Sequence, residues 1–218
     1  MIKAAHKKWA RWIFNPYCDF LLKRNFTNFF MVNEYPDLSL NLPLIITPNH
    51  ISWWDGFFID YLTRRYLKRK RYIMMLEEQL SRYWFFQKIG AFSIDPTHIK
   101  SIAETITYTQ EIVRNPQNFM VFYPQGSIEP FEMRPLGLKK GLQSVIKKIP
   151  DVQVLLPGFK IEYYNQKRPA VLGRFGRTMS GESIVADFKH YEDNFYNNLD
   201  SLSQAAFSKS YKEDLFQA

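Results

Sequence analysis

The chain reads Leu42-Pro43-Leu44-Ile45-Ile46-Thr47-Pro48-Asn49-His50-Ile51-Ser52-Trp53-Trp54-Asp55 where a short apolar run gives way to polar residues. The apolar part predicts a buried strand, because a continuous run of this length bounded by turn residues is typical of a parallel sheet. His50 then lies where a strand ends and a helix begins, at the edge of the sheet that often carries functional residues in α/β folds.

From Leu42 onward the pattern alternates between strand-like and helix-like segments. This alternation predicts one α/β domain with a central, mostly parallel sheet flanked by helices. The expected strands are 43–47, 71–75, 91–94, 118–123 and 152–157, and the expected helices are 55–68, 79–88, 98–114 and 137–148. Residues 158–176 predict a β-hairpin around Asn165-Gln166, and the polar tail from 187 to 218 predicts a helix.

The pattern of residues 1–34 predicts an amphipathic, membrane-associating segment ahead of the main domain at 35–218. Apolar residues recur at helical spacing on both sides of Asn15-Pro16, which predicts a pair of helices because proline inside a helix ends or kinks it. Tryptophans and lysines on different faces are typical of helices that lie in a membrane interface. We expect this pair to bind an anionic membrane surface; the alternative is a helical arm packed on the core.

The 218 residues carry 29 Lys and Arg against 21 Asp and Glu, a net charge of +8, and 17% of them are aromatic. This balance favours an anionic partner, either a membrane surface or nucleic acid. The basic residues are spread along the chain and no nucleic-acid-binding motif occurs, so no nucleic-acid partner is expected. The run Lys68-Arg69-Lys70-Arg71 is either a solvated surface segment or a contact for phosphate groups such as those of lipid headgroups.

Cys18 is the single cysteine, and the four histidines lack the spacing of metal ligands. We therefore expect neither a disulfide nor a metal site. The longest uncharged run, 38–54, is interrupted by prolines and asparagines and falls short of the roughly 20 apolar residues that span a bilayer. A cytoplasmic protein, peripheral on the inner face of the membrane, is the simplest expectation.

His50 and Asp55 together predict acid–base chemistry. Histidine is the side chain best suited to take a proton near neutral pH. A carboxylate five positions later can hold the imidazole in the required tautomer. By itself the pair is also compatible with a polar helix cap.

A second polar turn, Tyr123-Pro124-Gln125-Gly126-Ser127, follows the expected strand 118–123. Glycine allows close backbone approach, and the neighbouring amides can donate to an anion. An ordinary turn explains this segment equally well when it is considered alone. The predicted substrate-binding residues are Asn49, Gln125, Gly126, Ser127, Arg134 and Lys139.

Four motifs occur in order: Asn49-His50-x-x-x-x-Asp55, Gly90-x-Phe92-x-Ile94-Asp95, Tyr123-Pro-Gln-Gly-Ser127 and Leu155-Leu-Pro-Gly158. Over about residues 40–160 this order resembles the glycerolipid acyltransferase superfamily of the lysophosphatidic acid type. The resemblance implies His50 and Asp55 as the catalytic pair of an O-acyltransferase that uses acyl-CoA or acyl-carrier protein as co-substrate. It implies no bound cofactor.

Two motifs depart from the family pattern. The second usually ends in arginine, where this chain has Pro96. The third is typically Phe-Pro-Glu-Gly-Thr-Arg. In this chain Gln125 replaces the glutamate, Ser127 the threonine and Ile128 the arginine. In the family these positions are associated with the phosphate of the acceptor. The acceptor therefore stays open between lysophosphatidate, a related lysolipid and a glycolipid, and a catalytically silent lipid-binding homologue is a further alternative.

Overall fold

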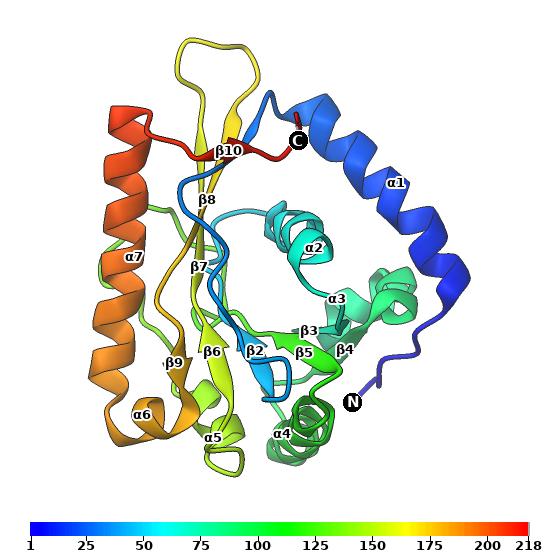
Figure 1. The fold of residues 1–218 in the computed structure, drawn as a ribbon. Coiled ribbons are helices and arrows are strands. Elements are labelled where there is room, and N and C mark those ends of the chain that lie inside the picture. The colour runs from blue at the N-terminus through cyan, green and yellow to red at the C-terminus, as the bar shows by residue number, and fades with distance from the viewer. Residues whose placement is uncertain (218) are drawn as a thin grey trace.

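The computed structural model describes residues 1–217 and contains a six-stranded sheet in the order β4-β3-β5-β2-β6-β9 (Figure 1). Neighbouring strands pair in parallel except at the edge, where β9 is antiparallel to β6. The predicted mostly parallel sheet is confirmed. Its strands are β2 (Leu44–Ile46), β3 (Lys70–Leu76), β4 (Ala91–Ile94), β5 (Asn118–Val121), β6 (Gln153–Leu155) and β9 (Met179–Ser180).

A second sheet of four strands has the order β10-β1-β8-β7. Its strands are β1 (Phe29–Met31), β7 (Pro157–Glu162), β8 (Ala170–Phe175) and β10 (Glu213–Asp214). The antiparallel pair β7 and β8 confirms the predicted hairpin. Leu156 alone separates β6 from β7, so the chain passes directly from the first sheet into the second. The predicted helical tail is only partly helical, because β10 pairs with β1.

Helices cover both faces of the six-stranded sheet. They are α1 (Lys8–Asn25), α2 (Asp55–Tyr66), α3 (Glu77–Arg82), a 3-10 helix at Trp84–Ile89, α4 (Ile99–Arg114), α5 (Gly141–Ile146), α6 (Gly181–Ala186) and α7 (Phe188–Ser208). Side chains of a strand point alternately to its two faces. Leu44 and Ile46 of β2 accordingly pack in one apolar cluster with α1 and α2, whereas Ile45 packs in another with α4 to α7.

The predicted pair of N-terminal helices is wrong: α1 is one helix with Pro16 inside it, and residues before Lys8 are not helical. Proline removes one backbone N–H, a local cost. Four residues at a spacing of four bury one face of α1 on both sides of that point, and their burial holds the helix together. They are Ala10, Phe14, Cys18 and Leu22. The preceding residues run along the sheet, where Ser93 N donates to Ile2 O at 2.9 Å.

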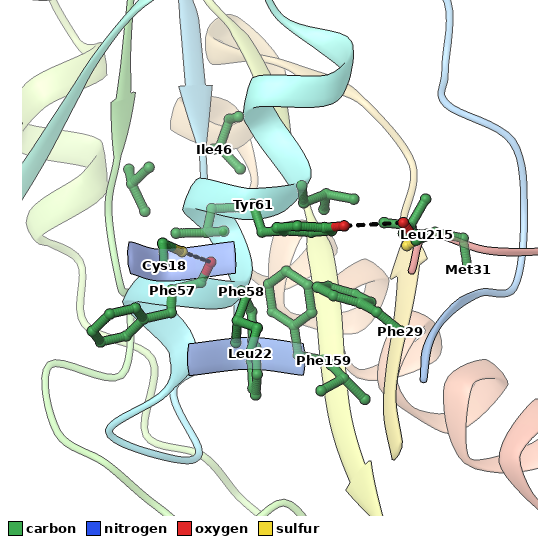
Figure 2. Packing of buried hydrophobic residues seen from close by; sticks show 14 of the residues in the cluster. Cys18, Leu22, Phe29, Met31, Ile46, Phe57, Phe58, Tyr61, Phe159 and Leu215 are labelled. Carbon is green, nitrogen blue, oxygen red and sulfur yellow. Dashed lines mark hydrogen bonds between the residues drawn. The ribbon is translucent and has the colours of Figure 1, made fainter. Parts of the chain in front are cut away.

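Figure 2 shows how α1 joins the core. Cys18 and Leu22 of α1 lie against Phe57 and Phe58 of α2, and Phe159 of β7 belongs to the same cluster. Segments 1–34 and 35–217 thus share one apolar interior. None of the helices in residues 1–217 is long and apolar enough to cross a membrane.

Candidate active site

His50 lies in the loop that joins the end of β2 to the start of α2. Its Nδ1 is 2.7 Å from Oδ2 of Asp55, the first residue of α2, whose side chain is fully buried. The backbone N–H groups of Ile51 and Ser52 donate to the same oxygen at 2.6 and 2.9 Å, and the Ser52 hydroxyl donates to Oδ1 at 2.8 Å. A carboxylate accepts from Nδ1–H, so Nε2 of the imidazole is left as a proton acceptor. The His50 side chain is 24% exposed, so a substrate can reach it.

The ring of Tyr123 fixes the plane of the imidazole. The two rings stack with their centroids 4.3 Å apart and their planes at 27°. Burial raises the pKa of Tyr123 well above its ordinary value, and the charge of Asp55 raises it further, so the phenol stays neutral. Sequence reasoning missed this role. The available signal was that Tyr123 stands at the end of the expected strand 118–123, as His50 follows the expected strand 43–47. These two strands, β5 and β2, are neighbours in the parallel sheet.

Gln125 binds the backbone of His50 with both ends of its amide. His50 N–H donates to Oε1 at 2.6 Å, and Nε2 donates to His50 O at 3.2 Å. The side chain is buried, and its Nε2 is also 3.4 Å from a carboxylate oxygen of Glu129. The structure therefore places this predicted substrate-binding residue beneath the loop, where it positions His50.

Asn49 forms the same kind of pair with a strand of the second sheet. Its Nδ2 donates to Phe159 O at 2.8 Å, and Phe159 N–H donates to its Oδ1 at 2.7 Å. Asn49 is buried, so it ties the His50 loop to β7. The side-chain amides of Asn49 and Gln125, which were predicted to bind substrate, therefore hydrogen-bond to backbone groups of this protein.

Gly126 and Lys139 meet at the turn after Gln125. Gly126 has φ +73°, a conformation that glycine adopts without strain. A Cβ placed there would be 2.8 Å from Nζ of Lys139, so the ammonium group lies across the turn. Lys139 is exposed and forms no ion pair with a carboxylate of the described residues 1–217. Ser127 is also exposed, and its hydroxyl donates to Glu129 Oε1 at 3.3 Å.

Arg134 is directed elsewhere. Its guanidinium contacts Asp200 of α7 at 3.1 Å and donates to the carbonyl oxygens of Phe131 and Met133 at 2.9 and 2.8 Å. Of the two cations among the predicted substrate-binding residues, Lys139 lies at the Gly126 turn, whereas Arg134 is bound to α7.

Comparison with known families decides the class of protein to which this site belongs. The sequence model of a family described as Acyltransferase matches residues 23–157, which include the first three motifs and all of the fourth except Gly158. This chain belongs to the acyltransferase family. The resemblance noted from the motifs is confirmed, and the protein is an acyltransferase enzyme.

A solved structure supports the same fold. The 1-acyl-sn-glycerophosphate (LPA) acyltransferase PlsC from Thermotoga maritima superposes with a TM-score of 0.57 over 87% of this chain and 78% of its own. The two sequences are only 13% identical, so this likeness shows that the two proteins share a fold and nothing more. No curated protein matches the sequence.

Replacing Gln125 by glutamate tests the amide pair beneath His50. In Gln125→Glu a carboxylate faces the carbonyl oxygen of His50 and the carboxylate of Glu129, so the new group has a raised pKa in the folded state. The variant then keeps its stability at low pH, where the carboxyl is protonated and can donate, and loses it as the pH rises through that pKa. We expect a loss of about 1–3 kcal/mol at pH 8 and less at pH 5.

Urea unfolding of wild type and variant at both pH values measures this loss. Gln166→Glu, at an exposed position in the β7–β8 turn, is the matched control and should change little at either pH. Equal losses in the two variants, or a Gln125→Glu loss independent of pH, would contradict the positioning role.

Proposed function

We propose that this acyltransferase moves a fatty acyl chain from acyl-CoA or acyl-carrier protein to the hydroxyl of a lysolipid. The supporting observation is the His50–Asp55 pair, 2.7 Å apart, in a loop fixed by buried hydrogen bonds. A hydroxyl is a poor nucleophile at neutral pH, so this reaction needs a positioned base. His50 Nε2 supplies that base.

The mechanism has two steps. His50 Nε2 takes the proton of the hydroxyl as its oxygen attacks the thioester carbonyl carbon, and Asp55 stabilises the imidazolium that forms. The tetrahedral intermediate then breaks the carbon–sulfur bond, and the departing thiolate takes the proton from His50. General-base catalysis of this kind contributes about 10²–10⁴-fold in rate.

The developing oxyanion needs a hydrogen-bond donor, and the turn after β5 offers one. The Gly126 N–H already donates to Tyr123 O at 3.2 Å. The next amide belongs to Ser127, an exposed residue of the turn, and we assign it as the oxyanion donor.

Lys139 supports an acceptor with an anionic headgroup. Its ammonium at the Gly126 turn supplies positive charge close in the chain to Ile128, one of the two positions at which the chain lacks a family arginine. Lysophosphatidate or a related anionic lysolipid is therefore the proposed acceptor.

An exposed aromatic face on α1 supports docking to a membrane from one side. The face consists of Trp9, Trp12, Ile13, Tyr17 and Phe20. Exposed Trp53 belongs to the His50 loop and packs on Phe57 of α2, the same ring that Phe14 of α1 contacts. Helix α1 thus packs beside the helix that follows the His50 loop, and aromatic residues such as those of its exposed face favour the membrane–water interface. We propose that the protein is peripheral on the anionic, cytoplasmic face of a membrane.

Loss of the base should abolish acyl transfer. We expect His50→Ala and Asp55→Asn to lower kcat by about 10²–10⁴-fold, because the first removes the base and the second its orienting charge. His190→Ala, at an exposed position on α7, is the control and should retain activity. Release of free thiol and mass spectrometry of the lipid products measure turnover with both donors. Unchanged turnover in His50→Ala would contradict the mechanism, and no turnover by wild type with either donor would favour a silent lipid-binding protein.

Lys139→Met should raise KM for lysophosphatidate about tenfold, because one charge-assisted contact to phosphate is lost. KM for an uncharged glycolipid or monoacylglycerol should not change. Lys140→Met, an adjacent exposed lysine, is the matched control. A similar rise with charged and uncharged acceptors would assign Lys139 a role in folding the turn.

Trp12→Ala should weaken partitioning onto anionic vesicles about tenfold, because the 79% exposed indole loses its burial in the interface. Phe207→Ala removes a 93% exposed ring from α7 and should have no effect. Vesicle flotation at low and high salt measures both. The docking face would be refuted if the two variants weakened binding equally.

A further inference from the structure

A basic cavity of about 270 Å³ lies between α1, α2 and the start of β3. Its lining includes Lys70 and Arg71, the first residues of β3, whereas the His50 loop follows the last residues of β2. Because β2, β5 and β3 run parallel, the start of β3 and the end of β2 lie at opposite ends of the strands. Neither His50 nor Asp55 lines the cavity. Arg71 is the point of approach between the two, since its guanidinium is 3.5 Å from the carbonyl oxygen of Gly56, the residue after Asp55.

Positive charge is in excess in this cavity. The fully buried Asp60 of α2 accepts from Arg11 at 2.5 Å, Arg64 at 2.9 Å and Arg71 at 2.8 Å. Lys70 adds a further cation to the lining, and Asp60 is its single carboxylate. Arg69 also lines the cavity, but its guanidinium donates to the carbonyl oxygens of Leu42 and Ser39.

The second carboxylate nearby does not balance the excess. Asp19 of α1 pairs with Arg64 and is not part of the lining. Burial opposes ionisation of Asp60, but the surrounding arginines hold its pKa below the ordinary value. Asp60 is thus already ionised and cannot neutralise further positive charge.

Three buried polar atoms around the cavity have no hydrogen-bond partner within residues 1–217. They are Nε of Arg71, Nε2 of His6 and Oδ1 of Asn15. Buried polar atoms left unpaired cost free energy and in native proteins normally meet a partner, water or a ligand. Arg71, at 7% exposure, presents an N–H donor, and a half-turn of the Asn15 amide presents an NH₂ group in place of its oxygen.

The ionisation of two lining residues reports the same imbalance. Burial lowers the pKa of Arg71 to about 10, in spite of Asp60. Burial, together with Lys70, Arg11 and Arg71, lowers the pKa of His6 to about 3. Both shifts arise first from burial, and an entering anion would oppose them because it favours the charged forms.

We propose that this cavity binds a phosphate group. Guanidinium groups match the geometry of phosphate oxygens, and a tetrahedral phosphate fits the available volume. Solvent reaches the cavity past Lys70, which is exposed, and Arg64, whose side chain is 26% exposed. The phosphate belongs either to a soluble nucleotide such as coenzyme A or to a lipid headgroup. The proposal does not depend on the acyl acceptor or on catalysis at His50.

NMR of the histidine imidazoles tests this site directly on the full chain. His6 lines the cavity, while His98 and His190 are exposed elsewhere and serve as internal controls. Inorganic phosphate, adenosine 3′,5′-bisphosphate and dihexanoyl phosphatidic acid are titrated separately, and calorimetry gives each Kd. We expect a saturable shift of the His6 signal and no shift of the His98 and His190 signals. The probe that binds most tightly distinguishes a nucleotide source from a lipid source.

Two neighbouring lysines provide matched variants. Lys70→Gln removes a cation from the cavity and should weaken the tightest probe about fivefold. Lys68→Gln makes the same charge change at an exposed position outside the lining and should leave Kd unchanged. Asn15→Asp places a carboxylate in the cavity without changing the size of the side chain and should remove binding.

The outcomes are separable from those for acyl transfer, because His50→Ala should bind phosphate as wild type does. No saturable His6 shift with any of the three probes would overturn the proposal. Equal weakening by Lys68→Gln and Lys70→Gln, or full binding by Asn15→Asp, would also overturn it, since each would mean that the anion binds outside this cavity.

Discussion

The buried carboxylate of Asp55 is the constraint on which the candidate site depends. A carboxylate removed from water must be satisfied by hydrogen bonds. Four donors meet it: the imidazole Nδ1 of His50, the backbone N–H groups of Ile51 and Ser52, and the Ser52 hydroxyl. All four come from the loop that precedes α2. The loop therefore closes around the carboxylate, and the closure directs the remaining ring nitrogen of His50 outward.

Two side-chain amides extend this constraint to the rest of the molecule. A carboxamide carries a donor and an acceptor, so it can pair with both backbone groups of one residue as a neighbouring strand does. Gln125 does so with His50, and Asn49 does so with Phe159 of the second sheet. The His50 loop is thereby fixed where the two sheets meet, close to the point at which the chain passes through Leu156 from one sheet to the other.

The parts of the fold that were predicted correctly carry a local signal. Strands β2 to β6 are short apolar runs between turn residues, and each was located from that pattern. Strand β10 carries no such signal. Its two residues form a strand only because they pair with β1, which lies far from them in the sequence. Pro16 gave a misleading signal, since its local cost is outweighed by the burial of one face of α1 in the common core.

The sequence by itself determined the order of strands β2 to β6 and the four motifs. It also placed His50 and Asp55 within reach of each other, because only five positions separate them across a loop and a helix start. Only the tertiary structure decided which distant side chains join them. In the folded chain Lys139 lies at the Gly126 turn, whereas Arg134 pairs with Asp200 of α7. The tertiary structure also placed Lys70 in the basic cavity and left Lys68 outside. Such choices follow from how helices and loops pack against the sheets, which spacing along the chain does not encode.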